Sequence, residues 1–508
     1  MSHTDHLPAA PHPALHRLLR SLHRALPPSE DVFLVGGGVR DLLLGRPLKD
    51  MDLACRDAEN VALRLARTLD AVFVPLGRDH DPPSFRVVLR DSDQHGTKSS
   101  QSFLDVTEIH GQDIVEDLGR RDFTVNAMAL ALRDLSSLTH PGPSLIDPYG
   151  GLDDLHRTLI RQTGPRTIAD DPARILRGFR MRAQLGWALD RATLDEIEKR
   201  APSLAKVPAE RLTSELRLIL ECPEGGRLLA EMDQAGVLAV LFPEVRDMRG
   251  CVQNHFHHLN VFEHSLAAVD HCEVLLAELD AVFSELREPI LAALAGWRLP
   301  WLKLAVLLHD IGKPGTKARL STRENTERIT FYGHDALGAT MAESIAVRLR
   351  LSTAERKYLT DLIRHHLHVG VLLRPEAKLK ARLRWMRRLG PDLIPATLLC
   401  LADVRATLGP ASSLQEHQAQ ETRSVALIRE YLEQTRTTFR VAPLINGHDL
   451  LALGLPPGPL LGRTLKQLQE AQDAGEITTR EEALRRVDQL LPGRTTENGT
   501  RQDRPEPW

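Results

Sequence analysis

Strand-forming patterns are confined to the first third of this 508-residue chain. Apolar and β-branched runs at 32–36, 52–55, 71–76, 85–90 and 102–107 are separated in several places by helical segments, which predicts a small α/β unit over residues 30–150. Beyond Asp170 such runs nearly vanish, and Leu-, Ala- and Arg-rich segments with helical spacing take over. Because this length exceeds one compact core, the sequence predicts an α+β chain: a small head followed by a long all-α body.

Cysteine usage and hydropathy limit where the chain works. The five cysteines are far apart, odd in number and form no CxxC pair, which favours a reducing compartment over disulfides or a cysteine zinc site. The N-terminus lacks the basic start and apolar run of a signal peptide, and no apolar stretch approaches the roughly 20 residues of a membrane span. We therefore expect a cytoplasmic protein with no membrane partner.

Charge and aromatic content leave the choice of partner open. The net charge of −3 does not by itself demand a nucleic acid, although clustered Arg and Lys could still bind a polyanion. Aromatic residues make up only 4% of the chain, which argues against extended base-stacking surfaces.

The stretch FLVGGGVRDLLLGRPLKDMDLAC, residues 33–55, places a glycine turn ahead of Asp50 and Asp52. Residues two apart on a strand project from one face, so these carboxylates could share divalent cations, as in phosphoryl or nucleotidyl transfer. Gly36 and Gly37 would let backbone N–H groups approach a triphosphate, next to a helix expected to start near Val39. Neither a dinucleotide-binding nor a Walker motif fits. The alternative is a tight turn followed by a solvated strand edge.

Two later segments offer further polar groups. Asp105, in the strand-like FLDVT, could be a third carboxylate brought alongside by sheet pairing, or a solvated strand residue. In GRRDFTVNAMAL, Arg120 and Arg121 could donate to phosphate or ribose oxygens, Asp122 could accept from a sugar hydroxyl, and Asn126 follows about one helical turn later. An RRD sequence alone is usually a surface feature.

In this order, the GGxVRD, DxD and RRDFTxNAMA motifs resemble the class II tRNA nucleotidyltransferase and bacterial poly(A) polymerase family. The resemblance continues through DPYGGLDDLHRTLIR, DDPARILRGFRMRAQLGW and ERLTSELRLIL, and covers residues 30–490. It implies template-independent addition of C or A to the 3′ end of tRNA, by in-line attack of the RNA 3′-hydroxyl on the α-phosphate of CTP or ATP with pyrophosphate leaving. The tRNA acceptor arm would be the partner, and Asp50 and Asp52 would hold Mg²⁺ with Asp105 as a further catalytic carboxylate.

The same resemblance implies a set of nucleotide-binding residues. They are Gly36, Gly37, Arg40, Asp41, Arg120, Arg121, Asp122, Asn126, Asp171, Arg174, Arg177 and Arg180. In the family a carboxylate-x-x-Arg motif reads the base; it falls here on Asp171 and Arg174, with Asp170 where relatives usually carry Glu. A spacing of three predicts that both side chains share one helical face. Asp171 also precedes Pro172, a pattern typical of a helix N-cap.

One connection departs from the family pattern. Family members that add C, C and A carry a long flexible loop between the acidic strand and RRDFT, but here only residues 107–119 join them. This resembles CC-adding enzymes, which leave the terminal A to a separate A-adding enzyme. Alternatively the connection varies freely, or residues 91–102 substitute for the loop. Full CCA addition and poly(A) polymerisation therefore remain as alternatives.

A histidine pattern in the helical body resembles the HD phosphohydrolase superfamily. A His–Asp doublet taken alone is usually structural, but here the residues follow one ordered pattern: His264, His309, Asp310, His334, His365, His366 and Asp403. The resemblance implies that His264, His309, Asp310 and Asp403 ligate one metal and that the other histidines complete a binuclear site, with Lys313 near phosphate. Such ligands suit Mn, Fe, Co, Ni or Zn.

The HD resemblance implies hydrolysis of 2′,3′-cyclic phosphates or 3′-phosphates at RNA ends. Alternatives are a silent HD domain, HD hydrolysis as the main activity, and an RNA-binding or nucleotide-sensing protein with a decayed head. The implied organisation is an N-terminal extension with a lead-in helix (1–28), a nucleotidyltransferase head with a mixed sheet (29–165), a helical neck (166–250), an HD domain (251–410), a helical tail (411–491) and a disordered end (492–508).

Overall fold

The computed structural model describes residues 21–490 apart from positions 23, 28, 49–50, 78–81, 90–102, 137–144, 254–258, 322–326, 408–413, 438 and 440. The predicted metal-binding Asp50, the 91–102 segment, most of the lead-in helix and the predicted disordered end lie outside the described residues. The chain divides into two compact units, Met1–Glu224 with Leu228–Pro243 and Gly225–Arg227 with Glu244–Trp508.

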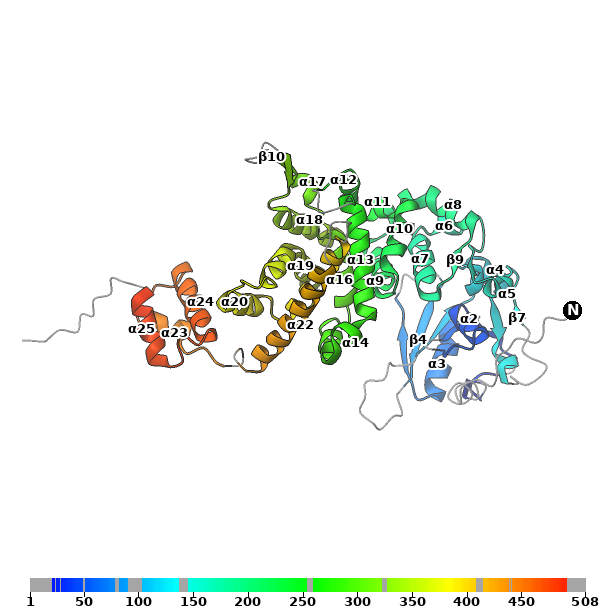
Figure 1. The fold of residues 1–508 in the computed structure, drawn as a ribbon. Coiled ribbons are helices and arrows are strands. Elements are labelled where there is room, and N and C mark those ends of the chain that lie inside the picture. The colour runs from blue at the N-terminus through cyan, green and yellow to red at the C-terminus, as the bar shows by residue number, and fades with distance from the viewer. Residues whose placement is uncertain are drawn as a thin grey trace, which may run out of the picture. The chain divides into compact units, whose positions relative to one another are not determined.

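The first unit combines a β-sheet with helices (Figure 1). The sheet has seven strands in the order β3-β4-β5-β2-β1-β6-β7. The strands are β1 Val32–Val35, β2 Met51–Cys55, β3 Val72–Pro75, β4 Ser84–Val88, β5 Phe103–Glu108, β6 Ala129–Ala131 and β7 Leu145–Ile146. Among the described strands of this sheet, β2 and β5 pair in parallel and the other neighbours are antiparallel, so the sheet is mixed, and the predicted fold class is confirmed. The sequence pattern does not predict β6 and β7, because such short strands show no alternation.

Alternation along β1 and β2 separates two apolar cores. Val32 and Leu34 belong to the larger core, whereas Phe33 and Val35 belong to a smaller core that includes residues of the helix Ile114–Gly119. The neighbours of Asp52 in β2 lie in the larger core, so Asp52 projects from the opposite face. An acidic residue in an otherwise apolar strand is therefore presented beside the smaller core.

Sheet register brings the predicted acidic residues to one level. Asp52 pairs with Val35, the last residue of β1, and on its other side with Asp105 of β5. Partners in a parallel pair project from the same face, so the side chains of Asp52 and Asp105 are neighbours. The glycine turn follows Val35 directly, and the helix begins at Gly37 rather than near Val39.

Helices cover and extend the sheet of the first unit. In chain order the remaining elements are α2 Gly37–Leu43, α3 Ala58–Thr68, α4 Ile114–Gly119, η1 Thr124–Asn126, η2 Leu132–Ser136, α5 Gly151–His156, β8 Leu159–Ile160, α6 Thr167–Asp170, α7 Arg174–Leu185, β9 Ala188–Leu189, α8 Arg191–Arg200, η3 Ala201–Lys206, α9 Ala209–Glu221, α10 Gly225–Gln234 and α11 Val237–Leu241. α7 packs closely on the head: a Cβ on Gly178 would lie 3.1 Å from the Phe123 ring.

The second unit is almost entirely helical (Figure 1). Its elements are α12 Val245–Arg249, α13 Val261–Ala277, α14 Leu279–Val282, η4 Ser284–Leu286, α15 Arg287–Ala293, α16 Arg298–Leu308, α17 Lys313–Thr316, β10 Ala318–Ser321, β11 Glu327–Thr330, α18 His334–Arg348, α19 Thr353–Leu372, α20 Leu379–Leu389, η5 Gly390–Asp392, α21 Leu393–Ala406, α22 Leu414–Arg436, α23 Gly447–Ala452, α24 Pro459–Asp473 and α25 Arg480–Leu490.

The apolar helix α16 forms the centre of this helical unit. Every residue from Pro300 to Leu308 is buried, and α16 packs against α13, α19 and α21. In the described part of the chain, no single helix is long and apolar enough to cross a membrane; the pair Ser284–Ala293 and Arg298–Thr316 meets that criterion only jointly, across a 95° bend.

Candidate functional site

A cavity of about 710 Å³ lies in the first unit, against the glycine turn, β2, the segment after α4 and the start of α7. Ten residues predicted to bind nucleotide or metal line it: Gly36, Gly37, Asp52, Arg120, Arg121, Asp122, Asn126, Asp171, Arg174 and Arg177. Arg40, Asp41, Asp105 and Arg180 are not among its described lining residues. One cavity therefore gathers most of the polar groups that the sequence distributes over about 140 residues.

Gly36 brings a backbone turn against two charged side chains. Its φ of 71° lies in the left-handed region, and a Cβ there would stand 3.1 Å from Arg121 Nη1 and 3.2 Å from Asp52 Oδ2. Arg121 is oriented from α4, where its Nη2 lies 3.2 Å from Asp117 Oδ2. A glycine is required here both by conformation and by the closeness of the two side chains.

Asp105 lies beside Asp52, but its carboxylate is engaged. Arg86 on β4 binds it with two hydrogen bonds, Nε to Oδ1 at 2.8 Å and Nη2 to Oδ2 at 2.8 Å. The same guanidinium lies 3.8 Å above the Phe103 ring. In this arrangement the predicted third carboxylate forms an ion pair beside the cavity.

Asp122 is a buried anchor for Arg177. Its Oδ1 accepts from the Phe123 N–H at 2.7 Å and from Asn126 Nδ2 at 3.2 Å, while its Oδ2 lies 3.0 Å from Arg177 Nε. Burial opposes the charge of this carboxyl group, but Arg177 and these hydrogen bonds hold its pKa below the usual value. Asn126 in turn accepts from Arg40 Nη1 at 2.8 Å. Asp122 thus fixes a cation that faces the cavity.

Arg180, which the sequence also assigns to the nucleotide, lies deeper on α7. Its Nε is 3.2 Å from Glu215 Oε2 of α9, and both side chains are largely buried. This pair joins α7, which carries Arg174 and Arg177 of the cavity wall, to α9.

The predicted single helical face for Asp171 and Arg174 is wrong. Asp170 ends α6, Asp171 is extended with φ −139° and ψ 96°, and α7 begins only at Arg174. Pro172 accounts for this, because a proline pushes the preceding residue out of the helical region. Asp171 Oδ1 nevertheless accepts from the Ala173 N–H at 3.2 Å, a cap-like role just ahead of α7.

Arg211 is a contact residue to which the sequence motifs assign no role. Its Nη2 donates to Asp171 Oδ2 at 2.8 Å, whereas Arg174 Nε lies 3.9 Å from the same oxygen. Burial opposes ionisation of Asp171, but Arg211 holds its pKa below the usual value. Arg211 lies in the ERLTSEL segment, which is part of the resemblance to the family. The spacing of that segment does not indicate that Arg211 contacts Asp171.

Arg174 is held separately from Asp171. Its Nη1 donates to the Thr167 carbonyl at 3.2 Å and its Nη2 to the Arg120 carbonyl at 2.6 Å. The two predicted base-reading side chains therefore line one cavity, each fixed by its own partners.

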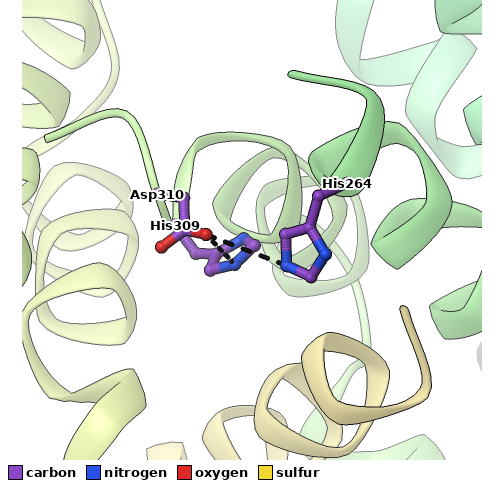
Figure 2. Close-up of side chains that lie close together, drawn as sticks. All are labelled: His264, His309 and Asp310. Carbon is purple, nitrogen blue, oxygen red and sulfur yellow. Dashed lines mark ion pairs between the residues drawn. The ribbon is translucent and has the colours of Figure 1, made fainter. Parts of the chain in front are cut away.

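A second polar centre lies inside the helical unit. His264 comes from α13, His309 and Asp310 follow α16, His334 begins α18 and His366 lies on α19. Figure 2 shows His264 and His309 directed at Asp310. Asp310 Oδ2 is 3.1 Å from His309 Nε2 and 3.8 Å from His264 Nε2, and its Oδ1 is 3.4 Å from His334 Nε2.

Ligand atoms in this centre form two groups that share Asp310. In each of the groups His264–His309–Asp310 and Asp310–His334–His366, all ligand atoms lie within 4.8 Å of one another. Asp403, from α21, adds an oxygen 2.9 Å from His264 Nε2 and 3.5 Å from His309 Nε2. A carboxylate that offers one oxygen to each group is suited to bridge two metal ions.

Hydrogen bonds behind three histidines set their tautomer. The Nδ1 atoms of His309, His334 and His366 lie 2.8, 2.7 and 2.6 Å from the backbone carbonyls of Val306, Phe331 and Ile363. A carbonyl only accepts, so each Nδ1 carries a proton, and in the neutral ring each Nε2 presents a lone pair to the centre. His334 Nε2 and His366 Nε2 lie 3.3 Å apart, so the two nitrogens face each other and suit a shared cation. The residues fit a metal centre.

Charge in the metal-free centre is uneven. Burial opposes protonation of His309, but Asp310 and Asp403 raise its pKa to about 10. Burial and the neighbouring His309 lower the pKa of His366 to about 4. Positive charge is therefore favoured on the side of the centre that holds His264, His309 and Asp403, and it is disfavoured at His366.

His365 is a predicted ligand that the structure places elsewhere. Its ring packs against Trp385 of α20 with centroids 5.1 Å apart, and it belongs to neither ligand group in the described part of the unit. Successive residues on a helix point about 100° apart, so His365 and His366 cannot both face the centre. Lys313 also differs from expectation, because its Nζ lies 2.6 Å from Asp310 Oδ2 rather than free for phosphate.

Comparison with known families divides the chain into four matched segments. Residues 32–161 match the "Poly A polymerase head domain" and residues 186–248 the "Probable RNA and SrmB- binding site of polymerase A". Residues 261–408 match the "HD domain", and residues 404–487 match tRNA nucleotidyltransferase domain 2.

Individual proteins resemble nearly the whole chain. It is 34% identical to the A-adding tRNA nucleotidyltransferase of Deinococcus radiodurans, over 89% of this chain and 93% of that protein. It is 33% identical to the CC-adding tRNA nucleotidyltransferase of Thermus thermophilus, over 89% and 92% respectively. A solved CCA-adding enzyme with ATP shares the fold at a TM-score of 0.60 and 20% identity, over 95% of this chain and 96% of that one.

Proposed function

Because this chain belongs to the tRNA nucleotidyltransferase family, we propose that its head adds C residues from CTP to the 3′ end of tRNA and releases pyrophosphate. The observation that carries the proposal is the cavity that gathers Asp52, Arg121, Asp171 and Arg174. We assign metal binding to Asp52, phosphate binding to Arg121 and base reading to Asp171 and Arg174, and the cavity that they line is large enough for a nucleotide.

Different residues would bind different parts of the nucleoside triphosphate. Mg²⁺ held by Asp50 and Asp52 would neutralise and bridge phosphate oxygens. Arg121 and Arg177 face the same cavity and can donate to phosphate or ribose oxygens, and the Gly36 turn lets backbone N–H groups approach. These contacts orient the α-phosphorus for the RNA 3′-hydroxyl, whose oxygen forms the new bond as the bond to pyrophosphate breaks.

Base choice rests on Asp171 and Arg174. A carboxylate accepts from the exocyclic amine that C and A carry, and a guanidinium donates to the neighbouring ring nitrogen or carbonyl. U and G present the opposite pattern at these positions. Each oxygen of Asp171 has spare acceptor capacity beside its present donor, the Ala173 N–H or Arg211.

The short connection supports CC addition. β5 ends at Glu108 and α4 begins at Ile114, so only residues 109–113 separate them. Residues 107–119 thus leave no room for a long loop, and a separate A-adding enzyme would then complete the end. Identity of 34% to an A-adding relative favours A addition as the second candidate.

Three tRNA substrates separate these functions. Full-length protein with Mg²⁺ is given tRNAs that end at the discriminator base, at C or at CC, with CTP or ATP supplied separately. We expect two C additions to the first, one to the second and no A on the CC end. Addition of A to the CC end with no use of CTP would support the A-adding candidate instead, and long A tails on unrelated RNA would support a poly(A) polymerase.

Replacement of Gly36 by alanine is expected to cost about 1–2 kcal/mol of stability through the left-handed backbone. It should also lower nucleotide addition by about tenfold, because the new Cβ forces Asp52 or Arg121 to move by a few tenths of an ångström. Gly186→Ala is the matched control, since Gly186 has a φ of 72° and a Cβ added there would meet no atom within 4 Å. Melting temperatures and addition rates of both variants test this; an equal loss of addition in the two would contradict it.

We further propose that the helical unit is a metal-dependent phosphohydrolase that acts on 2′,3′-cyclic phosphates or 3′-phosphates at RNA ends. Two ligand groups around Asp310 support this, with nitrogen and oxygen donors suited to Mn, Fe, Co, Ni or Zn. A metal bound there would supply a water nucleophile and polarise the phosphoryl group.

Metal uptake by this centre should release about one proton at neutral pH. The pKa of about 10 means that His309 is protonated in the metal-free protein, and a metal needs that lone pair. Affinity should therefore rise with pH until pH exceeds this pKa, and fall as the solution is acidified. Calorimetric titration with Co²⁺ in buffers of different ionisation enthalpy measures the proton count; a count of zero would contradict the expectation.

A further inference from the structure

Lys313 occupies a position inside the second polar centre that neither ligand group explains. Its side chain is buried, and its Nζ lies 2.6 Å from Asp310 Oδ2. Oδ2 is also the oxygen that faces His309 Nε2 at 3.1 Å. The ammonium group would therefore compete with a metal ion bound in the group His264–His309–Asp310 for this carboxylate oxygen.

Two further contacts fix this ammonium group. Lys313 Nζ donates to Gln253 Oε1 at 2.7 Å and lies 5.5 Å from the centroid of the Phe331 ring. Gln253 is itself buried, and its Nε2 donates to the Leu259 carbonyl at 3.3 Å, which fixes the orientation of its amide. The lysine is thus held in place by groups outside the ligand set.

We propose that Lys313 is the built-in counter-ion of Asp310 in the HD centre and that Gln253 holds it in place. A metal ion must displace Lys313 from Asp310 before it can bind the group His264–His309–Asp310. The inference rests on the proposed metal centre. A divalent metal ion placed against the same carboxylate oxygen would be strongly repelled by this ammonium group in a buried site. Lys313 therefore stabilises the metal-free protein and weakens metal binding. Once displaced, its ammonium group becomes available to a phosphate.

Lys313→Met keeps an unbranched side chain that is one atom shorter and removes its charge. Metal-free Lys313→Met should melt lower than wild type, because buried Asp310 loses the ammonium group that lies nearest to it. The same variant should bind Co²⁺ about tenfold more tightly or better, and gain more melting temperature from Co²⁺ than wild type does. Chelator competition, the visible spectrum of bound Co²⁺ and melting with and without metal provide the readouts.

Lys303→Met is the matched control. Lys303 is equally buried on α16 and pairs with Glu273 at 2.8 Å, outside both ligand groups. Its loss should lower the melting temperature with and without Co²⁺ alike and leave the affinity unchanged. Lys313→Gln, which also lacks the charge but keeps a polar end, replaces Lys313→Met if the latter does not fold.

The outcomes separate the inference from its premise. Unchanged or weaker Co²⁺ binding by a folded Lys313→Met or Lys313→Gln protein would overturn the counter-ion role alone. Failure of the wild-type protein to bind Co²⁺ at all would overturn the proposed metal centre and the inference with it.

Discussion

Replacing Asp52 by asparagine is expected to lower nucleotide addition by about a thousandfold or more, since a metal-holding carboxylate contributes several kcal/mol to such a reaction. Asparagine keeps the shape of the side chain between β1 and β5 and removes only the charge. The rate of C addition to tRNA lacking its 3′ end is the measurement, with the melting temperature as a check on folding.

Asp153→Asn controls for the loss of one carboxylate from the same unit. Asp153 is exposed and pairs with Arg157 on the surface of α5, so its replacement should leave addition unchanged. Asp52→Asn should also leave Co²⁺ binding by the helical unit unaffected. Residual addition within tenfold of wild type in Asp52→Asn would rule out the role assigned to this carboxylate.

Replacing Asp310 by asparagine is expected to abolish metal binding by both ligand groups, because each of them uses one oxygen of this carboxylate. Loss of a hydrogen-bond partner behind a metal ligand typically lowers metal affinity by roughly 10- to 100-fold, and loss of the ligand Asp310 itself should lower it by more. The buried Lys313 would also lose its counter-charge, at a cost of about 3–5 kcal/mol in stability. Metal content after dialysis against Co²⁺ and the melting temperature measure the two effects.

His366→Ala separates the groups. His366 belongs only to the group with Asp310 and His334, so its loss should remove one metal and keep the other. Nucleotide addition should survive in both variants. Stoichiometric metal binding by the Asp310→Asn protein would show that the two groups do not depend on Asp310 as a shared ligand.

Local pattern was sufficient to predict the strands that carry Asp52 and Asp105. Each lies in an apolar run long enough to show strand alternation, and register then brings them together. β6 and β7 escaped prediction, because so few residues carry no period and their place in the sheet depends on pairing with β1.

Side-chain direction and distant partners were harder to predict. The HH doublet suggests two ligands, yet helix geometry points His365 toward Trp385 instead. Arg211 lies 40 positions from Asp171, and only the packing of α9 beside α7 shows that they meet. Likewise, no spacing rule indicates that Arg86 binds Asp105 or that Gln253 holds Lys313.

The break between α6 and α7 shows a conflict between two local rules. The spacing in DDPAR suggests one helical face, but the proline favours an extended residue before it, and the proline effect prevails. As a result, Asp171 and Arg174 do not share one helical face, although both line the same cavity.

We propose that side chains in the head cavity, rather than an RNA template, choose the base. The direct measurement is the ratio of kcat/KM for CTP and UTP in single additions to tRNA ending at the discriminator base. Wild-type protein should use CTP almost alone, and Arg174→Met should reduce the preference by about 5- to 150-fold, the value of one bidentate base contact. An unchanged CTP preference in a folded, active Arg174→Met protein would contradict base choice by Arg174.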